Sequence, residues 1–460
     1  MDLNLVVLFI PCLFVLIVVE VLYSLYRGIP AYRWNDSLNN LATGISNQIF
    51  IVLFHTITIA GYLWIYHHWR IFDLPAWPGE PLWWMPTRDL FGISSKYMSF
   101  IIVALTWIVC LFVYEFAYYW NHRFSHEINF LWAGHIVHHQ SEEYNLGVAF
   151  RQASFRGLFT WVFYLPLAWI GFPPVVMIFN AQFSLIYQFL IHTKFVSKMP
   201  HWFESIFNTP SHHRVHHGRN PRYIDKNYGG MFIFFDKWFG TFEPETETPV
   251  YGIPTPLKSF NPLWANFHYW WEMIQSAKKF SNWKERVNVF FASPGSTNET
   301  KADDGDTFRR EKDVYHEKDK LGIFEKFDIS LSRGILFYVL FWSFAAILIS
   351  FLALWNVGRI PETILHNVFF ASVLTFVCVG GICDRKKWVL FLEPIRLLYL
   401  CLTFFQWFGV SNPSFVLLGF HLISFVWFFI FYRKSADPRQ TGADFEKRKS
   451  ETRIEESAAL

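Results

Sequence analysis

The chain is organised around three short runs, Asn121-His-Arg-Phe-Ser-His126, Gly134-His-Ile-Val-His-His139 and Ser211-His-His-Arg-Val-His-His217. Nine of the 18 histidines in the 460-residue chain lie within residues 122–139 and 212–217, where an even distribution would place about one. An excess of this size indicates a functional site, because histidine has no structural role that would concentrate it so strongly.

The spacing of these histidines suits one face of a helix. An α-helix has about 3.6 residues per turn, so side chains three and four positions apart are neighbours on its surface. Three sets of histidines follow this rule: His122 and His126; His135, His138 and His139; His213, His216 and His217. We therefore expect eight imidazoles to point the same way from three helical turns.

Imidazoles in this number indicate metal binding. Neutral imidazole binds iron, zinc, copper and nickel, and the absence of Cys from both stretches argues against a thiolate zinc finger or an iron–sulfur cluster. Eight ligands exceed the needs of one ion, so two metal ions fit the number. The alternative is an exposed or adventitious His-rich tract. Such tracts do not repeat an H-x-x-H-H spacing about 75 residues apart.

The composition around the histidines is that of a membrane protein. The chain is 53% hydrophobic and 21% aromatic, with only 17% charged residues. Apolar runs close to the ~20 residues that cross a bilayer lie at 4–26, 41–66, 98–120, 155–172, 174–192, 334–355, 363–383, 388–409 and 413–432. We therefore expect an all-α, polytopic membrane protein with about nine spans and a cytosolic helical site for two metal ions.

The fourth and fifth runs form a hairpin that relates the two histidine stretches. They are separated by Gly171-Phe-Pro-Pro174, which is typical of a tight turn between helices. Both a spanning and a re-entrant hairpin return the chain to its starting side, so both stretches should lie on one side of the membrane. Counting spans places the basic runs Arg385-Lys-Lys387 and Arg433-Lys434 on that side, which the positive-inside rule makes cytosolic.

Polar segments divide the chain further. A charged stretch poor in apolar residues follows the second histidine stretch, and a similar one ends the chain, so both are expected to be disordered. The net charge of +3 and the lack of a nucleic-acid-binding motif give no case for a nucleic acid partner. The predicted parts are 1–97, N-terminal spans; 98–292, the histidine domain; 293–320, a disordered linker; 321–434, a C-terminal four-span module; and 435–460, a disordered tail.

The three runs resemble the histidine boxes of the membrane-bound fatty acid hydroxylase superfamily of di-iron oxygenases. Two later segments, Asp225-Lys-Asn-Tyr-Gly-Gly230 and Asp236-Lys-Trp-Phe-Gly-Thr241, are similar to its D-x-N-Y-G and D-x-x-F-G-T segments. Residues 208–221 and the additional C-terminal spans are most similar to the branch of the superfamily that cleaves ether lipids. The box resemblance covers residues 98–245, and the architecture is similar over the whole chain.

This resemblance implies an oxidoreductase with two iron ions held by the eight box histidines. It implies hydroxylation by O2 of the alkyl carbon next to the ether oxygen of 1-O-alkylglycerols and lyso ether lipids, with release of a fatty aldehyde. Tetrahydrobiopterin would be the reductant, kept reduced by an external pterin-recycling system. The site would face the cytosol from the endoplasmic reticulum membrane, among membrane lipids.

Two residues next to the boxes are further candidates for a catalytic role. His192 ends the fifth apolar run, where superfamily members carry a His, and is predicted to be a ninth ligand or to support one. Glu127 directly follows His126 and could orient an imidazole or bind the pterin. The sequence contains no dinucleotide-binding, P-loop or haem-attachment motif, so electrons must come from outside the chain.

Three other polar residues lie close to the boxes. Asp225 and Asp236 could accept imidazole N–H bonds, or could cap turns. His212 is expected outside the metal shell, because on a helix it points about 100° away from His213.

Two other functions remain open. One is a sterol or fatty acyl hydroxylase or desaturase that receives electrons from cytochrome b5 at the same iron site. The other is a metal-binding or transport protein without redox chemistry. A transporter usually places its ligands near the bilayer midplane in broken helices, whereas these boxes lie in polar segments beyond the ends of the spans.

Overall fold

A computed structural model describes residues 5–78, 95–295 and 326–435 of the chain. The predicted disordered linker at 293–320 and tail at 435–460 lie outside these ranges, apart from their first residues.

Helices make up the regular structure of the described ranges, as predicted, and the only β pairing there is two isolated bridges, Phe207 with Phe232 and Gly218 with Tyr251. The elements are α1 (Leu5–Arg27), α2 (Trp34–Trp69), α3 (Ser95–Glu127), α4 (Asn129–Ala133), α5 (Ile136–His139), η1 (Leu146–Phe150), α6 (Arg156–Thr160), η2 (Trp161–Tyr164), α7 (Leu165–Ile170), α8 (Pro174–Ile191), α9 (His201–Ile206), α10 (Pro210–His216), α11 (Phe234–Phe239), α12 (Pro262–Lys278), α13 (Trp283–Phe291), α15 (Arg333–Trp355), α16 (Glu362–Cys383), α17 (Val389–Phe408) and α18 (Asn412–Ser435).

Fewer helices can cross a membrane than the sequence predicts. Seven helices of the described ranges are long and apolar enough, or eight if α2, which bends by 50° between Phe54 and Thr56, counts as one span. The prediction of a polytopic membrane protein is confirmed, but the predicted nine spans are one or two too many.

The predicted span at 155–172 is the one that does not form. The chain makes three short helices there, α6, η2 and α7, while α8 is an 18-residue candidate span. Pro166 contributes to the break, because proline has no N–H to donate to the carbonyl four residues before it, and it lies in the first turn of α7. Gly171 ends α7 with φ 112°, and a Cβ atom there would lie 1.9 Å from the Phe72 carbonyl oxygen. The turn therefore requires glycine.

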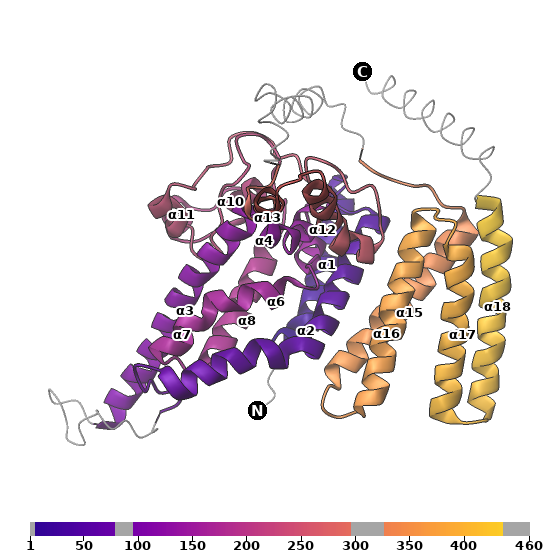
Figure 1. Ribbon diagram of the computed structural model, residues 1–460, viewed down its shortest axis with the longest axis horizontal. Helices are drawn as coiled ribbons and strands as arrows, with labels where there is room; N and C mark the ends of the chain where they lie inside the picture. The colour runs from indigo at the N-terminus through magenta and orange to yellow at the C-terminus, as the bar shows by residue number, and fades with distance from the viewer. Residues whose placement is uncertain (1–4, 79–94, 296–325, 436–460) are drawn as a thin grey trace. The chain divides into compact units, whose positions relative to one another are not determined.

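The chain divides into two compact units, residues 1–257 with 264–326, and residues 258–263 with 327–460. The second unit is built from α15 to α18 (Figure 1). A buried ion pair between Glu393 and Arg396 lies in its interior, and the Arg396 guanidinium also lies 4.1 Å from the centre of the Trp342 ring. Because every polar group of this pair has a partner, a role in holding α15, α16 and α17 together accounts for it.

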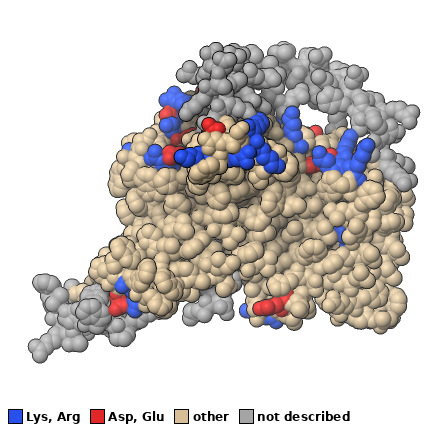
Figure 2. Space-filling model, in the orientation of Figure 1, with Lys and Arg blue, Asp and Glu red and all other residues tan. Residues whose placement is uncertain are grey.

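In the first unit α3 carries the chain from the apolar region to the histidines. Its 33 residues are about 50 Å long, which exceeds the ~30 Å thickness of a hydrocarbon core. His122 and His126 are in its last two turns, and α4 and α10 to α13 gather at this end of the helix (Figure 1). Lys and Arg side chains are concentrated at the same end, whereas the flank of the spans carries few charged side chains (Figure 2).

Candidate metal centre

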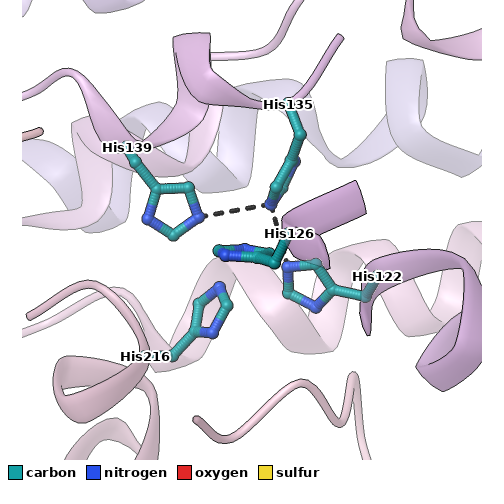
Figure 3. Close-up of side chains that lie close together, drawn as sticks. All are labelled: His122, His126, His135, His139 and His216. Carbon is teal, nitrogen blue, oxygen red and sulfur yellow. Dashed lines mark hydrogen bonds between the residues drawn. The ribbon is translucent and has the colours of Figure 1, made fainter. Parts of the chain in front are cut away.

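Nine histidines, far apart in the sequence, form two groups. The ligand nitrogens within each group lie within 4.8 Å of one another. The five-histidine group, drawn in Figure 3, contains His122, His126, His135, His139 and His216. The four-histidine group contains His138, His192, His213 and His217. None of the nine is more than 8% exposed, so water has little access to these nitrogens.

The helices that carry the histidines bring the three boxes together with His192, which lies outside the boxes in the sequence. Box one is the end of α3, and box two is α5 with His135 just before it. Box three is α10, which begins at Pro210, a residue suited to the first turn of a helix, and ends with His217 as its C-cap. His192 is the C-cap residue of α8. The second and third boxes each divide their side chains between the two groups.

Backbone carbonyls fix the orientation of four rings. Each of these imidazoles donates its Nδ1–H to a carbonyl oxygen, which can only accept. The pairs are His122 with Tyr228 (2.7 Å), His216 with Lys226 (2.9 Å), His138 with Arg151 (2.9 Å) and His192 with Gln188 (2.6 Å). A neutral ring with its proton on Nδ1 presents a lone pair at Nε2, which is the form that binds a metal.

The four-histidine group shows most clearly that a cation fits between the rings. The Nε2 atoms of His138 and His192 face each other at 3.3 Å, although both rings already donate from Nδ1. Two lone pairs at this distance repel unless a positive charge lies between them. In addition, the Nε2 atoms of His126, His216 and His217 are buried without a hydrogen-bond partner. The donor set and its geometry therefore suit metal ions, and both groups could hold one.

The positive charge expected between the facing Nε2 atoms does not come from protonated imidazoles. Burial lowers the pKa of His192 to about 4, and it lowers the pKa of His138 well below the usual value, with His192 adding to the effect. Burial, reinforced by neighbouring charges, also lowers the pKa values of His135, His139, His213, His216 and His217 well below 6.5. These rings are therefore neutral at pH 7.

The other candidate residues lie around the two groups. Glu127 pairs with Arg123 at 2.8 Å, its side chain is 37% exposed, and it belongs to neither group. Its predicted role in catalysis or pterin binding stays a prediction. His212 also lies outside both groups, with its ring against Phe242.

The two predicted aspartates have different partners. Asp225 Oδ1 is 3.7 Å from His126 Nδ1, which is close to the ring but longer than a hydrogen bond, so its role as an imidazole acceptor stays a prediction. Asp236 contacts backbone instead, accepting hydrogen bonds from the N–H groups of Tyr228 and Gly229.

Arg151 supports the site but could not be recognised from the sequence. This buried side chain donates to the Val137 carbonyl (2.7 Å), to Gln140 Oε1 (2.7 Å) and to Asn40 Oδ1 (3.1 Å), and so holds box two against α2. Burial lowers its pKa to about 10. The available signal was a single cation just before the apolar run at 155, which by itself does not indicate burial.

The segment that carries the histidines is similar to known proteins. Residues 107–241 match the family described as Fatty acid hydroxylase, which confirms the resemblance predicted from the boxes. Alkylglycerol monooxygenase of Homo sapiens is 38% identical over 289 residues, 62% of this chain and 58% of the relative. Alkylglycerol monooxygenase of Xenopus tropicalis is 37% identical over 286 residues, 61% of this chain and 57% of the relative.

The matched segments thus span little more than half the length of these relatives. A more distant relative, an ornithine lipid hydroxylase of Rhizobium tropici, is 29% identical over 136 residues, 29% of this chain and 41% of the relative. No solved structure gives a significant match.

Proposed function

We propose that this protein is a tetrahydrobiopterin-dependent alkylglycerol monooxygenase with two iron ions per chain. The observation that carries the proposal is the set of nine buried imidazoles in two adjoining groups. It is supported by the family match over residues 107–241, which contains all nine of these histidines, and by the similarity to alkylglycerol monooxygenases.

The donor set is compatible with iron, and the similarity to alkylglycerol monooxygenases favours a redox enzyme over the alternatives. Imidazole nitrogens without thiolates suit Fe, Zn, Cu or Ni, and two neighbouring sites allow two electrons to be handled together. A non-redox metal-binding or transport protein is the less favoured function, because the groups lie at helix ends and not in a broken helix at the bilayer midplane.

The position of the groups suits a substrate with a long alkyl tail. Because α3 is continuous from the apolar region to His122 and His126, a chain lying beside this helix can keep its tail in hydrocarbon while its ether carbon reaches the histidines. A 1-O-alkylglycerol or a lyso ether lipid has this form. A water-soluble substrate would gain nothing from a site built on membrane spans.

The reaction consumes one O2 for each ether bond. Bound iron would supply the oxidising chemistry that activates O2. One oxygen atom enters the C–H bond next to the ether oxygen, and the other leaves as water with two protons and two electrons from the pterin. The resulting hemiacetal breaks into a fatty aldehyde and glycerol or its derivative.

The chain's own residues prepare the site for this reaction. The carbonyls of Tyr228, Lys226, Arg151 and Gln188 orient the rings, and burial keeps the imidazoles unprotonated. Tight enclosure excludes water, which would otherwise compete for the reacting groups.

The reductant and the location complete the proposal. Glu127, which follows His126 in the sequence and has a partly exposed side chain, could accept hydrogen bonds from the pterin's ring N–H and exocyclic amine. The basic residues at the histidine end favour a cytosolic orientation, and the endoplasmic reticulum membrane is the location we propose, with reduced pterin supplied by an external recycling system.

An assay of the purified full chain in detergent tests the function. With iron, O2, an alkylglycerol and tetrahydrobiopterin, we expect release of fatty aldehyde, and a matched preparation carrying His213→Ala should release none. Turnover that instead requires cytochrome b5 and its reductase, with no effect of pterin, would assign the protein to the sterol or fatty acyl hydroxylases and desaturases. Bound metal without any oxidation product would favour the non-redox alternative.

A further inference from the structure

A single loop, residues 225–228, contacts three of the five imidazoles in the five-histidine group. Asp225 lies 3.7 Å from His126, and the carbonyls of Lys226 and Tyr228 accept from His216 and His122. The Tyr228 ring also packs beside the same three rings, at centroid distances of 5.3 to 6.1 Å. Among the hydrogen bonds of the described residues, none joins this loop to a ring of the four-histidine group.

The loop has a backbone conformation that must be held in place. Asp225 and Asn227 have φ angles of 61° and 56°, in the left-handed region that most residues avoid. Asn and Asp tolerate this region better than other non-glycine residues. Two left-handed residues within three positions turn the Lys226 and Tyr228 carbonyls toward the histidines.

Asn227 and Asp236 supply the hydrogen bonds that hold the loop. The Asn227 Nδ2 group donates to the His212 carbonyl (3.0 Å) and the Glu243 carbonyl (2.8 Å), and its Oδ1 accepts from the Glu243 N–H (2.9 Å). Asp236 accepts from the N–H groups of Tyr228 (2.7 Å) and Gly229 (2.8 Å). Both side chains are fully buried, so water cannot replace these bonds.

The four-histidine group is oriented by other parts of the chain. His138 donates to the Arg151 carbonyl and His192 donates to the Gln188 carbonyl on α8. A disturbance of the loop therefore reaches three rings of the five-histidine group directly and leaves the orienting bonds of His138 and His192 intact.

We propose that Asn227 and Asp236 are positioning residues that control metal binding selectively at the five-histidine group, through the loop 225–228 that their hydrogen bonds hold in place. This inference rests on the proposed metal centre and adds to it that the two sites can be emptied separately. Outer partners of metal ligands typically change metal affinity by ~10- to 100-fold, and these residues hold the partners of three ligands at once.

Two variants and one control test the proposal in the full-length protein. Asn227→Gly removes the amide bonds while keeping a residue that adopts the left-handed conformation freely. Asp236→Asn keeps the shape but turns an amide N–H toward a backbone N–H. Tyr223→Phe is the matched control, because it deletes a buried hydroxyl that bonds Thr246 and Glu247 in the same segment without reaching a histidine.

The measurement is iron bound per chain as free iron is varied, together with the spectroscopic coupling between the two ions. Wild type and Tyr223→Phe should bind two ions as a coupled pair. Each loop variant should retain one tightly bound, uncoupled ion, with the second bound ~10- to 100-fold more weakly. If Asn227→Gly fails to fold, Asp236→Asn carries the same test.

Three results would overturn the proposal. Wild-type binding of both ions in the loop variants would show that the loop does not position the ligands. Equal weakening of both sites would show that it supports the whole fold and not one group. If the wild-type protein binds fewer than two ions, the proposed metal centre itself is wrong. This result is measured on the wild type alone and does not depend on the loop variants.

Discussion

The five-histidine and the four-histidine groups come from the same boxes but are held in place differently. The five-histidine group receives two rings from one membrane helix, α3, and is surrounded by a loop with left-handed residues. The four-histidine group receives His192 from the end of α8 and is oriented by carbonyls at Gln188 and Arg151. The five-histidine group is therefore supported by a loop that follows all three boxes in the sequence. The four-histidine group is supported by carbonyls that lie between the second and third boxes.

This difference has a consequence for how each group tolerates damage. The five-histidine group has one imidazole more than the other, so the loss of one ring leaves it with as many as the intact four-histidine group has. The four-histidine group has no such reserve. Substitutions that remove a ring, or the support of a ring, should therefore act unequally on the two.

The largest effect should come from removing a ring. Both His135→Ala and His192→Ala should lower activity by at least ~100-fold, since loss of a ligand should exceed the effect of losing an outer partner. Of these two variants, His192→Ala should lose more iron per chain, because its group has only four imidazoles and would keep three. His212→Ala, which adjoins a box but lies outside both groups, should stay within a few-fold of wild type. Equal iron loss from both ligand variants would remove the distinction between the groups.

A smaller effect is expected from Arg151→Lys. Arginine reaches three acceptors here, on α2 and around α5, and a lysine ammonium cannot occupy all three positions. Box two should shift, and His138 should be affected most, because its Nδ1–H donates to the Arg151 carbonyl. Iron affinity should therefore fall by about tenfold at the four-histidine group, more than at the five-histidine group. This effect would be the reverse of the one expected from the loop variants, which should weaken the five-histidine group. An Arg151→Lys protein with the wild-type affinity at both groups would show that backbone packing alone holds His138.

The smallest effect should come from Glu127→Ala. Its carboxylate lies outside both groups and is partly exposed, so iron content should be unchanged. If it binds the pterin, the concentration of tetrahydrobiopterin needed for half-maximal rate should rise about tenfold, the equivalent of one hydrogen bond to a charged group. Arg123→Ala is the matched control for the ion pair. Loss of iron from Glu127→Ala would instead make it part of the metal shell.

Much of the fold could be predicted because membrane spans are read from local composition. The runs that became α1, α3, α8 and α15 to α18 are apolar over a bilayer-crossing length, and length with hydropathy suffices to recognise them. The run at 155–172 has the same composition but contains Pro166, and its broken backbone depends on packing against neighbouring helices that no local pattern describes.

The sequence was sufficient to predict which histidines form the site, but not how they divide into two groups. Helical spacing identified eight of the nine clustered histidines, and a position at the end of an apolar run indicated the ninth, His192. Helical spacing does not identify Arg151 or Asn227, because both act by binding backbone groups from distant parts of the chain.

By itself, the sequence determined the class of this protein and the chemical type of its site, because hydropathy and the i, i+3, i+4 spacing are local properties. Only the tertiary structure decided which imidazole joins which group. His138 and His139 are adjacent in one turn, and their rings diverge by about 100° on a helix, so each enters the group that its direction reaches. That outcome depends on where α3, α8 and α10 meet α5, which is a matter of packing between segments up to about 90 residues apart.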